Sequence, residues 1–568
     1  MRTHDSTPAG SRLLRGLASS ILAIWAASIP TLPAVAQSAG QIARSENGVV
    51  VAAQPLAAAA GARMLELGGN AADAAVAAAF AISVVEPSMN SIGGRNQILV
   101  RLPDGSIHGI DGTTSVPLGY DPETAPSASY GYATVGVPGS VAGLMRLHSE
   151  FGSLPLEVVA APAIDYAEHG FRVLPGEARR QAGSASQIAE SAGASRYYLK
   201  ADGSSYTAGD LLVQRDMART LTAIAHGGAD AFYRGEIAEK IAADMAANGG
   251  FVTMEALDAY DAEDSRIVRG TYRGYEIVGS DIPASGSVAI QALQIAENFD
   301  PEALGAEAWA SVIGQSIALA LEDYMRLGSD TAAVRATSKD WAARQAGRIQ
   351  LPANAMGGRE IPARVDPGLL PSDQGHTTHL SAADGNGMAV ALTQTLGPGM
   401  GSRVATPGLG FLYAVTLGGY LGISEPGERA RSGITPFMVL RDGEPVLVLG
   451  AAGGIRIISA VVQAVTRVVD DGMTLPEALA APRVHPDMNL RTGELMGLSV
   501  EAAPDDGWSD AALERFDELG LTVAPANRRG AFGRIHGLHY DAETGIWTGA
   551  ADPDWEGAAV IPMVDRRR

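Results

Sequence analysis

The stretch that most constrains the fold is 373–381, Asp-Gln-Gly-His-Thr-Thr-His-Leu-Ser, together with the run at 388–395 that follows it. A polar connection rich in proline and glycine precedes it at 351–372. Apolar residues then recur at every second position of 388–395, which predicts a β-strand with one buried face. The chain is therefore expected to pass from a loop into a pair of threonines and on into the core of a sheet.

This arrangement suits a chain that cuts itself. Scission of the peptide bond between His376 and Thr377 would leave Thr377 with a free α-amine beside its own hydroxyl, so that one residue supplies both nucleophile and base. Taken alone, the pattern is weak, because two threonines at the start of a strand usually form a solvated edge. Other parts of the sequence have to decide between these interpretations.

Composition narrows the class of protein. The 568 residues are 46% hydrophobic and 18% charged, which is ordinary for a soluble globular protein with more than one packed layer. A formal net charge of −21 disfavours nucleic-acid binding. The absence of cysteine excludes disulfides, a thiolate nucleophile and cysteine-ligated metals. His536 and His539 would point to opposite faces of one strand, so we predict no metal, and we predict no cofactor.

The N-terminus has the features of a cleaved signal peptide. Arg12 and Arg15 precede a short apolar run at 16–27, and Ala-Val-Ala at 34–36 fits a cleavage site. A membrane anchor is the alternative, but the run is short and Pro30 follows it. We therefore expect an exported mature protein, periplasmic or secreted, with no membrane association.

The coarse pattern of helices and strands predicts a layered α+β sandwich, because the elements alternate without βαβ regularity. The expected strands are 48–52, 98–102, 107–111, 272–278, 387–396, 438–441, 445–449, 493–496, 521–524, 534–540 and 546–550. The expected helices are 55–67, 71–84, one that ends near 150, 155–169, 177–192, two within 210–248 broken at Gly227-Gly228, one that ends at 299, 306–328, 455–471 and 475–481.

Eight short stretches, in this order, resemble the γ-glutamyltranspeptidase (glutathione hydrolase) family over residues 46–555. They are Leu67-Gly-Gly-Asn-Ala-Ala-Asp-Ala74, Val84-Val-Glu-Pro87 with Gly93-Gly94, Gly136-Val-Pro-Gly-Ser-Val-Ala-Gly143, Tyr272-Arg-Gly-Tyr275, Thr377-Thr-His-Leu-Ser381, Ala452-Gly-Gly-Ile-Arg456, Ala480-Ala-Pro-Arg483 and Ala551-Asp-Pro553. Each stretch is weak by itself, whereas their joint order is specific.

The resemblance implies a four-layer αββα sandwich of the N-terminal nucleophile (Ntn) hydrolase class. It also implies autocatalytic cleavage between His376 and Thr377. Residues 1–36 would then be the signal peptide, 37–376 a large chain and 377–568 a small chain. The two chains would pair in one domain that acts on a small amide or peptide-like substrate.

The resemblance also assigns catalytic roles. Thr377 would be the nucleophile, and its α-amine, with a pKa of about 7.7–8.0 in model compounds, could accept the hydroxyl proton near neutral pH. Gly453 and Gly454 would offer backbone N–H groups to the oxyanion, and Thr395 matches a second family threonine that contacts the amine. His379 could suggest a Ser/His/Asp triad, but the sequence contains no G-x-S-x-G motif.

The substrate-recognition positions depart from the family pattern. Thr113 stands where an arginine normally binds the substrate carboxylate, and Thr416 and Gly419 stand where an acidic residue and its neighbour normally bind the α-amine. Of two carboxylate-binding serines only Ser432 remains, followed by Gly433. Hydrogen bonds to charged groups contribute about 1.5–3 kcal/mol each, so these losses would weaken recognition of glutathione by orders of magnitude.

Two arginines in glycine-rich loops, Arg95 and Arg403, could replace the missing carboxylate ligand, although they could equally be surface residues. Three hypotheses follow. The first is an amidohydrolase or acyltransferase whose acyl group is not ordinary γ-glutamyl, and hydrolysis is favoured over transfer. The second is a true γ-glutamyltransferase or glutathione hydrolase with substitute ligands. The third is an inactive binding homologue.

Overall fold

The computed structural model describes residues 40–351 and 376–563, apart from 126, 328, 419–424, 490–491, 503–506, 521 and 527–531. By its internal contacts the chain divides into Met1–Ala39 and one unit, Gly40–Arg568. The predicted signal peptide, the connection up to residue 375 and Gly419 therefore lie outside the described residues.

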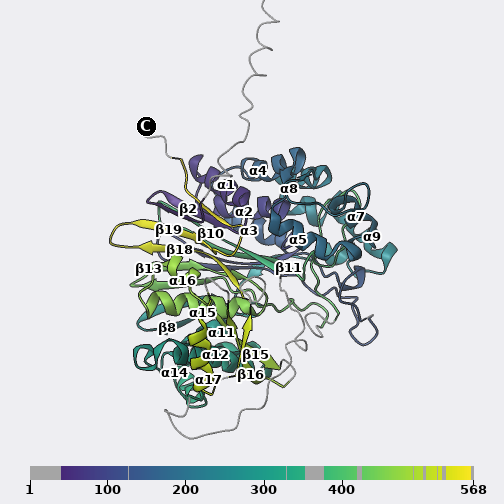
Figure 1. Cartoon of the computed structure of the whole chain (residues 1–568). Coiled ribbons are helices and arrows are strands. Elements are labelled where there is room, and N and C mark those ends of the chain that lie inside the picture. The colour runs from purple at the N-terminus through teal and green to yellow at the C-terminus, as the bar shows by residue number, and fades with distance from the viewer. Residues whose placement is uncertain are drawn as a thin grey trace, which may run out of the picture. The chain divides into compact units, whose positions relative to one another are not determined.

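One antiparallel sheet carries the Thr377 stretch at its centre (Figure 1). Its strands, in spatial order, are β20 (Ala558–Val560), β2 (Gly48–Ala52), β10 (His376–Asp384), β11 (Ala389–Gly397), β3 (Arg95–Arg101), β4 (Ile107–Gly112) and β7 (Glu263–Asp264). The predicted β2 is confirmed residue for residue. In β3 the strand begins at Arg95, three residues before the predicted start.

A second antiparallel sheet draws strands from both ends of the chain. Its order is β1 (Ile42–Ser45), β19 (Ile546–Ala551), β18 (Arg534–Asp541), β13 (Glu444–Leu449), β12 (Phe437–Arg441), β9 (Tyr275–Ser280) and β8 (Ile267–Tyr272), and β14 (Ala451–Ala452) also pairs with β18.

The two sheets pack face to face through a buried apolar cluster. Val51, Leu99 and Ala391 of the first sheet share this cluster with Met438 and Val448 of the second. Every residue of β11 is buried, so the prediction of one buried face was wrong. The reason is that a helix layer covers the other face of the same sheet, and both faces are excluded from water.

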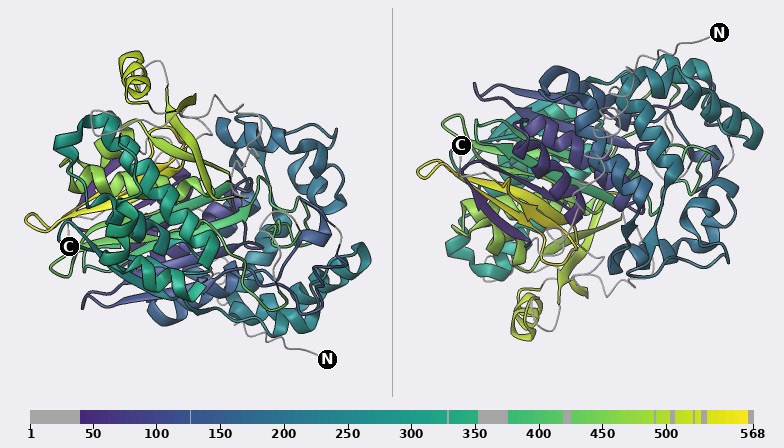
Figure 2. Two further views of the ribbon diagram at one scale, coloured as in Figure 1. Left: turned by 90° about the horizontal axis from the view of Figure 1, so that it is seen from below. Right: turned by 90° about the horizontal axis from the view of Figure 1, so that it is seen from above.

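Helices cover the outer faces of both sheets, which gives the predicted αββα order (Figures 1 and 2). α1 (Pro55–Glu66) and α2 (Ala71–Val85) lie on β2, β10 and β11. α11 (Gly286–Ala296) and α15 (Arg456–Val469) lie on the second sheet, with α12 (Pro301–Leu327) packed against them. Phe437 and Leu447 join these helices in a buried apolar cluster.

Small residues let α1 and α2 approach closely. A Cβ at Gly61 of α1 would lie 2.7 Å from the Ala74 carbonyl oxygen of α2. Asn70 begins α2, as predicted, by accepting hydrogen bonds from the Ala72 and Asp73 N–H groups, while the Asp73 carboxylate accepts from the Asn70 N–H.

The other helices surround this sandwich. They are α3 (Ser140–Phe151), α4 (Leu156–His169), α5 (Pro175–Gly183), α6 (Ala185–Ile188), α7 (Ala192–Tyr198), α8 (Arg215–Tyr233), α9 (Glu236–Asn248), α10 (Met254–Asp258), α13 (Ser329–Ala336), α14 (Lys339–Ala346), α16 (Leu475–Ala480), α17 (Asp510–Glu518) and a 3₁₀ turn, Tyr132–Thr134. Short sheets are formed by β15 (Val484–Asn489), β16 (Glu494–Glu501) and β17 (Val523–Ala526), and by β5 (Phe171–Arg172) and β6 (Leu211–Leu212).

Two predicted elements were wrong in detail. The helix expected at 177–192 is three short helices, α5 to α7. The strand expected at 272–278 is a hairpin, because Arg273 (φ 51°) and Gly274 (φ 84°) turn the chain between β8 and β9. The break expected at Gly227-Gly228 is confirmed, because Gly228 has a non-helical backbone (φ 61°, ψ −147°) that interrupts α8 before it resumes to Tyr233.

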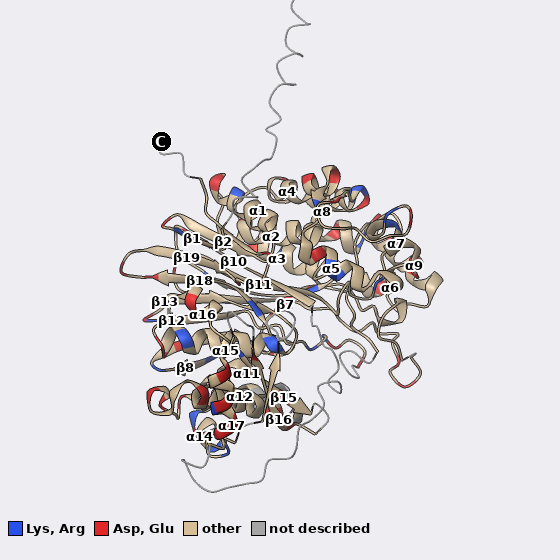
Figure 3. Cartoon of the chain, viewed as in Figure 1, with Lys and Arg blue, Asp and Glu red and all other residues tan. Residues whose placement is uncertain are grey.

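One described helix, Pro301–Met325, is long and apolar enough to cross a membrane, but 72% of its most apolar window is buried inside the protein, as in a core helix. Acidic residues occupy the outer helices α8, α12 and α17, whereas the strands at the centre are mostly neutral (Figure 3).

Candidate active site

Thr377 lies at the start of β10. The pairing of β10 with β11 changes register between His376 and Thr377. Its side chain is 4% exposed and faces Thr395 of β11 across the strand pair. The Thr377 Oγ1 donates a hydrogen bond of 3.1 Å to the Thr395 Oγ1. The predicted nucleophile and the predicted second threonine are thus in direct contact.

Thr395 connects this hydroxyl to the peptide bond in front of it. The Thr395 Oγ1 donates a hydrogen bond of 2.6 Å to the His376 carbonyl oxygen, and it accepts one of 2.9 Å from the Gly397 N–H. A donor aimed at this carbonyl polarises it and would stabilise an oxyanion formed there. The Thr395 hydroxyl thus contacts both the Thr377 hydroxyl and the carbonyl of the peptide bond that precedes Thr377.

Successive side chains of β10 point to opposite faces, as predicted. Thr378 points toward α2, where its Oγ1 donates a hydrogen bond of 2.8 Å to Glu86 Oε2. His379 points toward the second sheet, and its ring nitrogens lie 2.8 Å from Thr393 Oγ1 and 3.0 Å from Ser381 Oγ. Burial depresses the pKa of His379 well below its usual value, so this imidazole is a neutral core residue.

A buried charged cluster lies behind Thr378. Glu86 Oε1 accepts hydrogen bonds from Trp555 Nε1 (3.2 Å) and from Arg180 Nη2 (3.5 Å), and Arg180 also pairs with Glu177 (3.0 Å). Burial raises the pKa of Glu86 to about 7, although Arg180 lowers it. The carboxylates of Glu86 and Glu177 therefore share the Arg180 guanidinium, and Glu86 connects this cluster to Thr378.

Gly453 and Gly454 lie between β14 and α15, and β14 packs against β10. Their φ angles of 138° and 60° are accessible to glycine at little cost. A Cβ at Gly433 would lie 2.7 Å from the Gly454 carbonyl oxygen. The predicted oxyanion donors and one predicted substrate-binding residue are therefore adjacent.

Ser432 is fixed by its neighbours. Its N–H donates to the Pro283 carbonyl (2.8 Å), its carbonyl accepts from Ser285 Oγ (2.8 Å), and its Oγ accepts from the Ile434 N–H (3.2 Å). Two of these bonds use the backbone of Ser432, and the third uses its Oγ as an acceptor. None of the three uses the hydroxyl proton.

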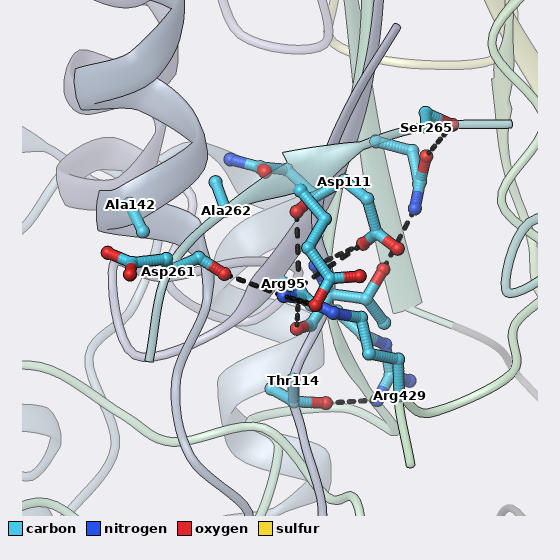
Figure 4. Close-up of polar contacts among 12 residues, drawn as sticks. Arg95, Asp111, Thr114, Ala142, Asp261, Ala262, Ser265 and Arg429 are labelled. Carbon is cyan, nitrogen blue, oxygen red and sulfur yellow. Dashed lines mark hydrogen bonds and ion pairs between the residues drawn. The ribbon is translucent and has the colours of Figure 1, made fainter. Parts of the chain in front are cut away.

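Arg429, from a distant segment, lies beside Asp111 (Figure 4) and also bonds to the backbone carbonyl of Thr113, where the family arginine is missing. Arg429 Nη1 donates to the carbonyl oxygens of Asp111 (3.1 Å) and Thr113 (3.3 Å) and to the Tyr260 hydroxyl (2.8 Å). Its Nη2 pairs with Glu263 (2.9 Å). Burial raises the pKa of Asp111, and the nearby Arg429 opposes that shift. These contacts hold Arg429 inside the protein.

Thr416 and Arg95 belong to the same internal cluster. Thr416 Oγ1 donates to Thr114 Oγ1 (2.9 Å), and Arg95 Nη1 donates to the Val415 carbonyl (3.0 Å). Arg95 is 1% exposed and Thr416 is fully buried. The structure thus brings together Thr113, Thr416 and Arg95, and all three side chains point into protein and not toward solvent.

Arg403 differs from Arg95. It follows β11 in a tight turn, has a left-handed φ of 59°, and stacks its guanidinium 5.1 Å from the centre of the Tyr130 ring. Its Nε is buried and has no hydrogen-bond partner among the described residues. It is close enough to His376 to influence the pKa of that imidazole.

Sequence reasoning missed Glu86, Arg180 and Arg429. Glu86 stands inside a stretch that carries the family resemblance, which was a usable signal. The other two had none, because the residues that place them here, Glu86 for Arg180 and Asp111 for Arg429, are distant from them in the sequence. Within the described part of the chain, no group of three or more His, Asp or Glu side chains could hold a metal ion.

Comparison with known proteins identifies the family. The profile described as Gamma-glutamyltranspeptidase matches residues 57–561. The chain is 33% identical over 476 residues to a glutathione hydrolase proenzyme of Pseudomonas sp. (strain A14), covering 78% of this chain and 82% of that protein. It is 34% identical over 471 residues to an acylase ACY 1 proenzyme of Pseudomonas sp. (strain V22), covering 78% and 83%.

A solved structure agrees with these relatives. The fold matches the crystal structure of cephalosporin acylase from Bacillus halodurans with a TM-score of 0.81 and 26% identity, and the match covers 100% of both chains. The chain therefore belongs to the γ-glutamyltranspeptidase family and is an autoprocessed amidohydrolase of the Ntn-hydrolase class.

Proposed function

We propose that this protein is an exported amidohydrolase that uses Thr377 as its nucleophile and that its acyl specificity differs from γ-glutamyl. The contact chain from Thr377 Oγ1 through Thr395 Oγ1 to the His376 carbonyl oxygen carries the proposal. Export rests on the signal-like sequence before residue 37.

The first reaction occurs once, in the precursor. Thr377 Oγ1 attacks the His376 carbonyl carbon, and the Thr395 hydroxyl donates to the oxyanion. Collapse breaks the His376–Thr377 C–N bond, and the departing nitrogen takes a proton to become the α-amine. Water then hydrolyses the ester, which leaves a carboxylate on His376 and restores the Thr377 hydroxyl.

Each later turnover repeats this chemistry on a substrate. The free α-amine accepts the Oγ1 proton, Oγ1 attacks the amide carbonyl, and the leaving amine takes that proton. Water resolves the acyl-enzyme. Gly453 and Gly454, on the loop beside β10, are the proposed backbone donors to the oxyanion, and Ser432 and Gly433 adjoin them.

Altered specificity is supported by the Thr113 cluster. The guanidinium that bonds to the Thr113 carbonyl belongs to Arg429, and it is also held by the Asp111 carbonyl, a tyrosine and acidic side chains. In addition, the stretch 418–424 contains no acidic residue that could bind an α-amine. An acyl group without that amine fits the sequence better than γ-glutamyl does.

A denaturing gel tests the nucleophile. The wild-type protein should separate into two fragments, and the smaller one should begin at Thr377 by N-terminal sequencing. Thr377→Ala should remain one chain and hydrolyse no amide, whereas Thr377→Ser should process slowly. Processing of the alanine variant, or a fragment that begins elsewhere, would disprove the assignment.

Kinetics test the specificity. Release of 4-nitroaniline from γ-glutamyl-4-nitroanilide should be slower than from amides whose acyl group lacks the α-amine. A kcat/KM for the γ-glutamyl compound well above all others would favour the second candidate, a true γ-glutamyltransferase, for which Arg403 remains an available carboxylate ligand.

A further inference from the structure

The end of β10 that the proposed cut sets free has a strand neighbour on one side only. Thr377 and Thr378 pair with β11, whereas β2 pairs with β10 only from Leu380 onward. Among the described strands, no other one pairs with residues 377–379. In the precursor the bond to His376 also holds this end. The cut itself rests on the proposed function, and after it another contact has to keep the nucleophile in place.

The C-terminal end of α2 and the turn after it lie beside this strand end. Thr378 Oγ1 donates a hydrogen bond of 2.8 Å to Glu86 Oε2, and both residues are buried. Its cross-strand partner on β11, Gln394, donates to Ser83 Oγ (2.7 Å) and to Asn90 Oδ1 (2.8 Å). The end of one helix therefore binds both strands at a position one residue beyond the nucleophile.

Glu86 is itself held in place. Its Oε1 accepts hydrogen bonds from Trp555 Nε1 (3.2 Å) and Arg180 Nη2 (3.5 Å). The guanidinium groups of Arg180 and Arg534 each lie 4.3 Å from the centre of the Trp555 ring. Glu86 and Arg180 belong to the proposed large chain, whereas the tryptophan and Arg534 belong to the small one. After the cut, these contacts therefore join the two chains beside the nucleophile.

We propose that Glu86 is a positioning residue for amide turnover: by accepting the Thr378 hydroxyl, it keeps the end of β10 in place, so that the nucleophile stays against Thr395 once the chain is cut. Glu86 acts through Thr378 and not on the substrate, because both of its carboxylate oxygens have partners within the cluster. Precise placement matters for the rate, since a shift of about 1 Å in a reacting group can slow a reaction about 100-fold.

A comparison of self-cleavage with turnover tests the proposal. Thr378→Val removes the hydroxyl and keeps the shape, so kcat of the cut enzyme should fall about 10- to 100-fold while KM changes little. Self-cleavage should stay close to the wild-type rate, because the bond to His376 still holds the strand end in the precursor. Thr378→Ser keeps the hydroxyl and should retain most of kcat. The substrate is γ-glutamyl- or glutaryl-4-nitroanilide, whichever the wild type hydrolyses faster.

Thr393→Val is the matched control. Thr393 lies on the neighbouring strand, is as buried as Thr378, and makes a contact of the same length, 2.8 Å, with His379 Nδ1 on the face toward the second sheet. This variant should also lower the free energy of unfolding in urea but should keep kcat. Equal losses of kcat in the two valine variants would mean that any loosening of the sheet slows turnover, and would overturn the proposal.

Glu86→Gln adds a test that uses pH. Burial raises the pKa of Glu86 to about 7. Its carboxyl is therefore mainly neutral at about pH 6, where an amide resembles it, and mainly charged at about pH 9, where a hydroxyl donates to it more strongly. The ratio of wild-type kcat to that of Glu86→Gln should accordingly be close to one at about pH 6 and larger at about pH 9.

The other charged groups at Glu86 are the same in both proteins. They are Arg180 and Glu177, both from α5, and Arg534, which lies against the same tryptophan ring as Arg180. The change of the ratio with pH therefore reports on Glu86. A ratio that stays constant from about pH 6 to pH 9 would overturn the proposal.

The gel separates this inference from the proposed function. An uncut wild-type chain, or a wild type that hydrolyses neither anilide, would contradict the proposed function. A cut and active wild type whose kcat survives Thr378→Val would contradict only the role of Glu86. Splitting of each variant into two fragments shows that it folds, and if Thr378→Val stays uncut, the pH dependence of Glu86→Gln decides.

Discussion

The Thr377 end of β10 and the Thr113 end of β4 lie in the same sheet but are built in opposite ways. At Thr377 two hydroxyls and one carbonyl form a short neutral chain, and both threonines come from adjacent strands. At Thr113 a guanidinium from residue 429 binds two backbone carbonyls and an acidic side chain. Pairing between adjacent strands thus builds the proposed catalytic end, whereas contacts between distant segments surround Thr113, where substrate recognition was predicted.

The largest effect is expected from Arg429→Met. Loss of a mostly buried cation leaves Asp111 and Glu263 without their partner, and breaking a buried pair costs about 3–5 kcal/mol of unfolding free energy. Urea denaturation should show this loss, while Arg234→Met, which removes an exposed cation with two exposed partners, should change the unfolding free energy much less. Equal losses would mean that the cluster is no more important than a surface ion pair.

Thr395→Val should slow both self-cleavage and amide turnover. Removal of one oxyanion donor typically costs about 100- to 1,000-fold in rate, which applies to self-cleavage. Amide turnover loses the contact between the Thr395 and Thr377 hydroxyls, and valine keeps the shape of threonine. Time courses on gels and anilide hydrolysis measure the two reactions. Thr395→Ser keeps the hydroxyl and should retain most of both rates, so a valine variant as fast as the serine variant would contradict the role of the Thr395 hydroxyl.

Glu86→Gln should change how stability depends on pH. The pKa of Glu86 is raised from 4.5 to about 7, so the folded protein holds a proton that the unfolded chain releases between these values. Stability contributed by this group is therefore complete below about pH 4.5 and is lost as the pH rises toward 7, by at most about 3 kcal/mol.

The Tm of the wild type relative to Glu86→Gln should accordingly fall between pH 4.5 and 7 and level off above that. Glu177 and Arg180 share the cluster and stay unchanged, so the difference isolates Glu86. Parallel curves for the two proteins would show that Glu86 titrates normally.

The smallest effect is expected from Thr113→Arg, which restores the residue type common in the family. Because Thr113 is buried and Arg429 already lies against its backbone, the new side chain overpacks the cluster at a cost of about 1–3 kcal/mol and should not increase γ-glutamyl hydrolysis. Adding Arg429→Met should relieve the overpacking. Raised γ-glutamyl activity in Thr113→Arg alone would show that position 113 is still open to substrate.

The sequence predicted best where the signal was local. Asn70 begins α2 because its side chain caps the next residues, and β2 follows from an uninterrupted apolar run. The β8–β9 hairpin was missed because its turn uses Arg273 at positive φ, a residue that carries no turn signal. The prediction of one buried face for β11 also failed, because α2 covers the second face, and the sequence of β11 alone does not show this.

The site divides in the same way. Alternation placed Thr378 and His379 on opposite faces of β10, and the structure confirms it. Sequence could not distinguish Arg95 from Arg403, because the difference lies in their partners: Val415 for the first, and a tyrosine ring for the second. Likewise, Arg483 and Asp552 form a buried ion pair of 2.6 Å that joins two of the stretches resembling the family. Their spacing in the sequence did not predict this contact.

The position of the proposed cut has a consequence for how the mature protein keeps its shape. β10 is paired on one side with β11 from His376 onward, with a register irregularity between His376 and Thr377, and on the other with β2 from residue 380. Scission before Thr377 separates only the His376–Gly397 pair from the β10–β11 ladder and leaves the rest of both ladders in the small chain. The new amino terminus would thus be anchored at the end of a central strand, so the protein could lose a covalent bond at its reactive centre without losing the rigidity that the reaction requires.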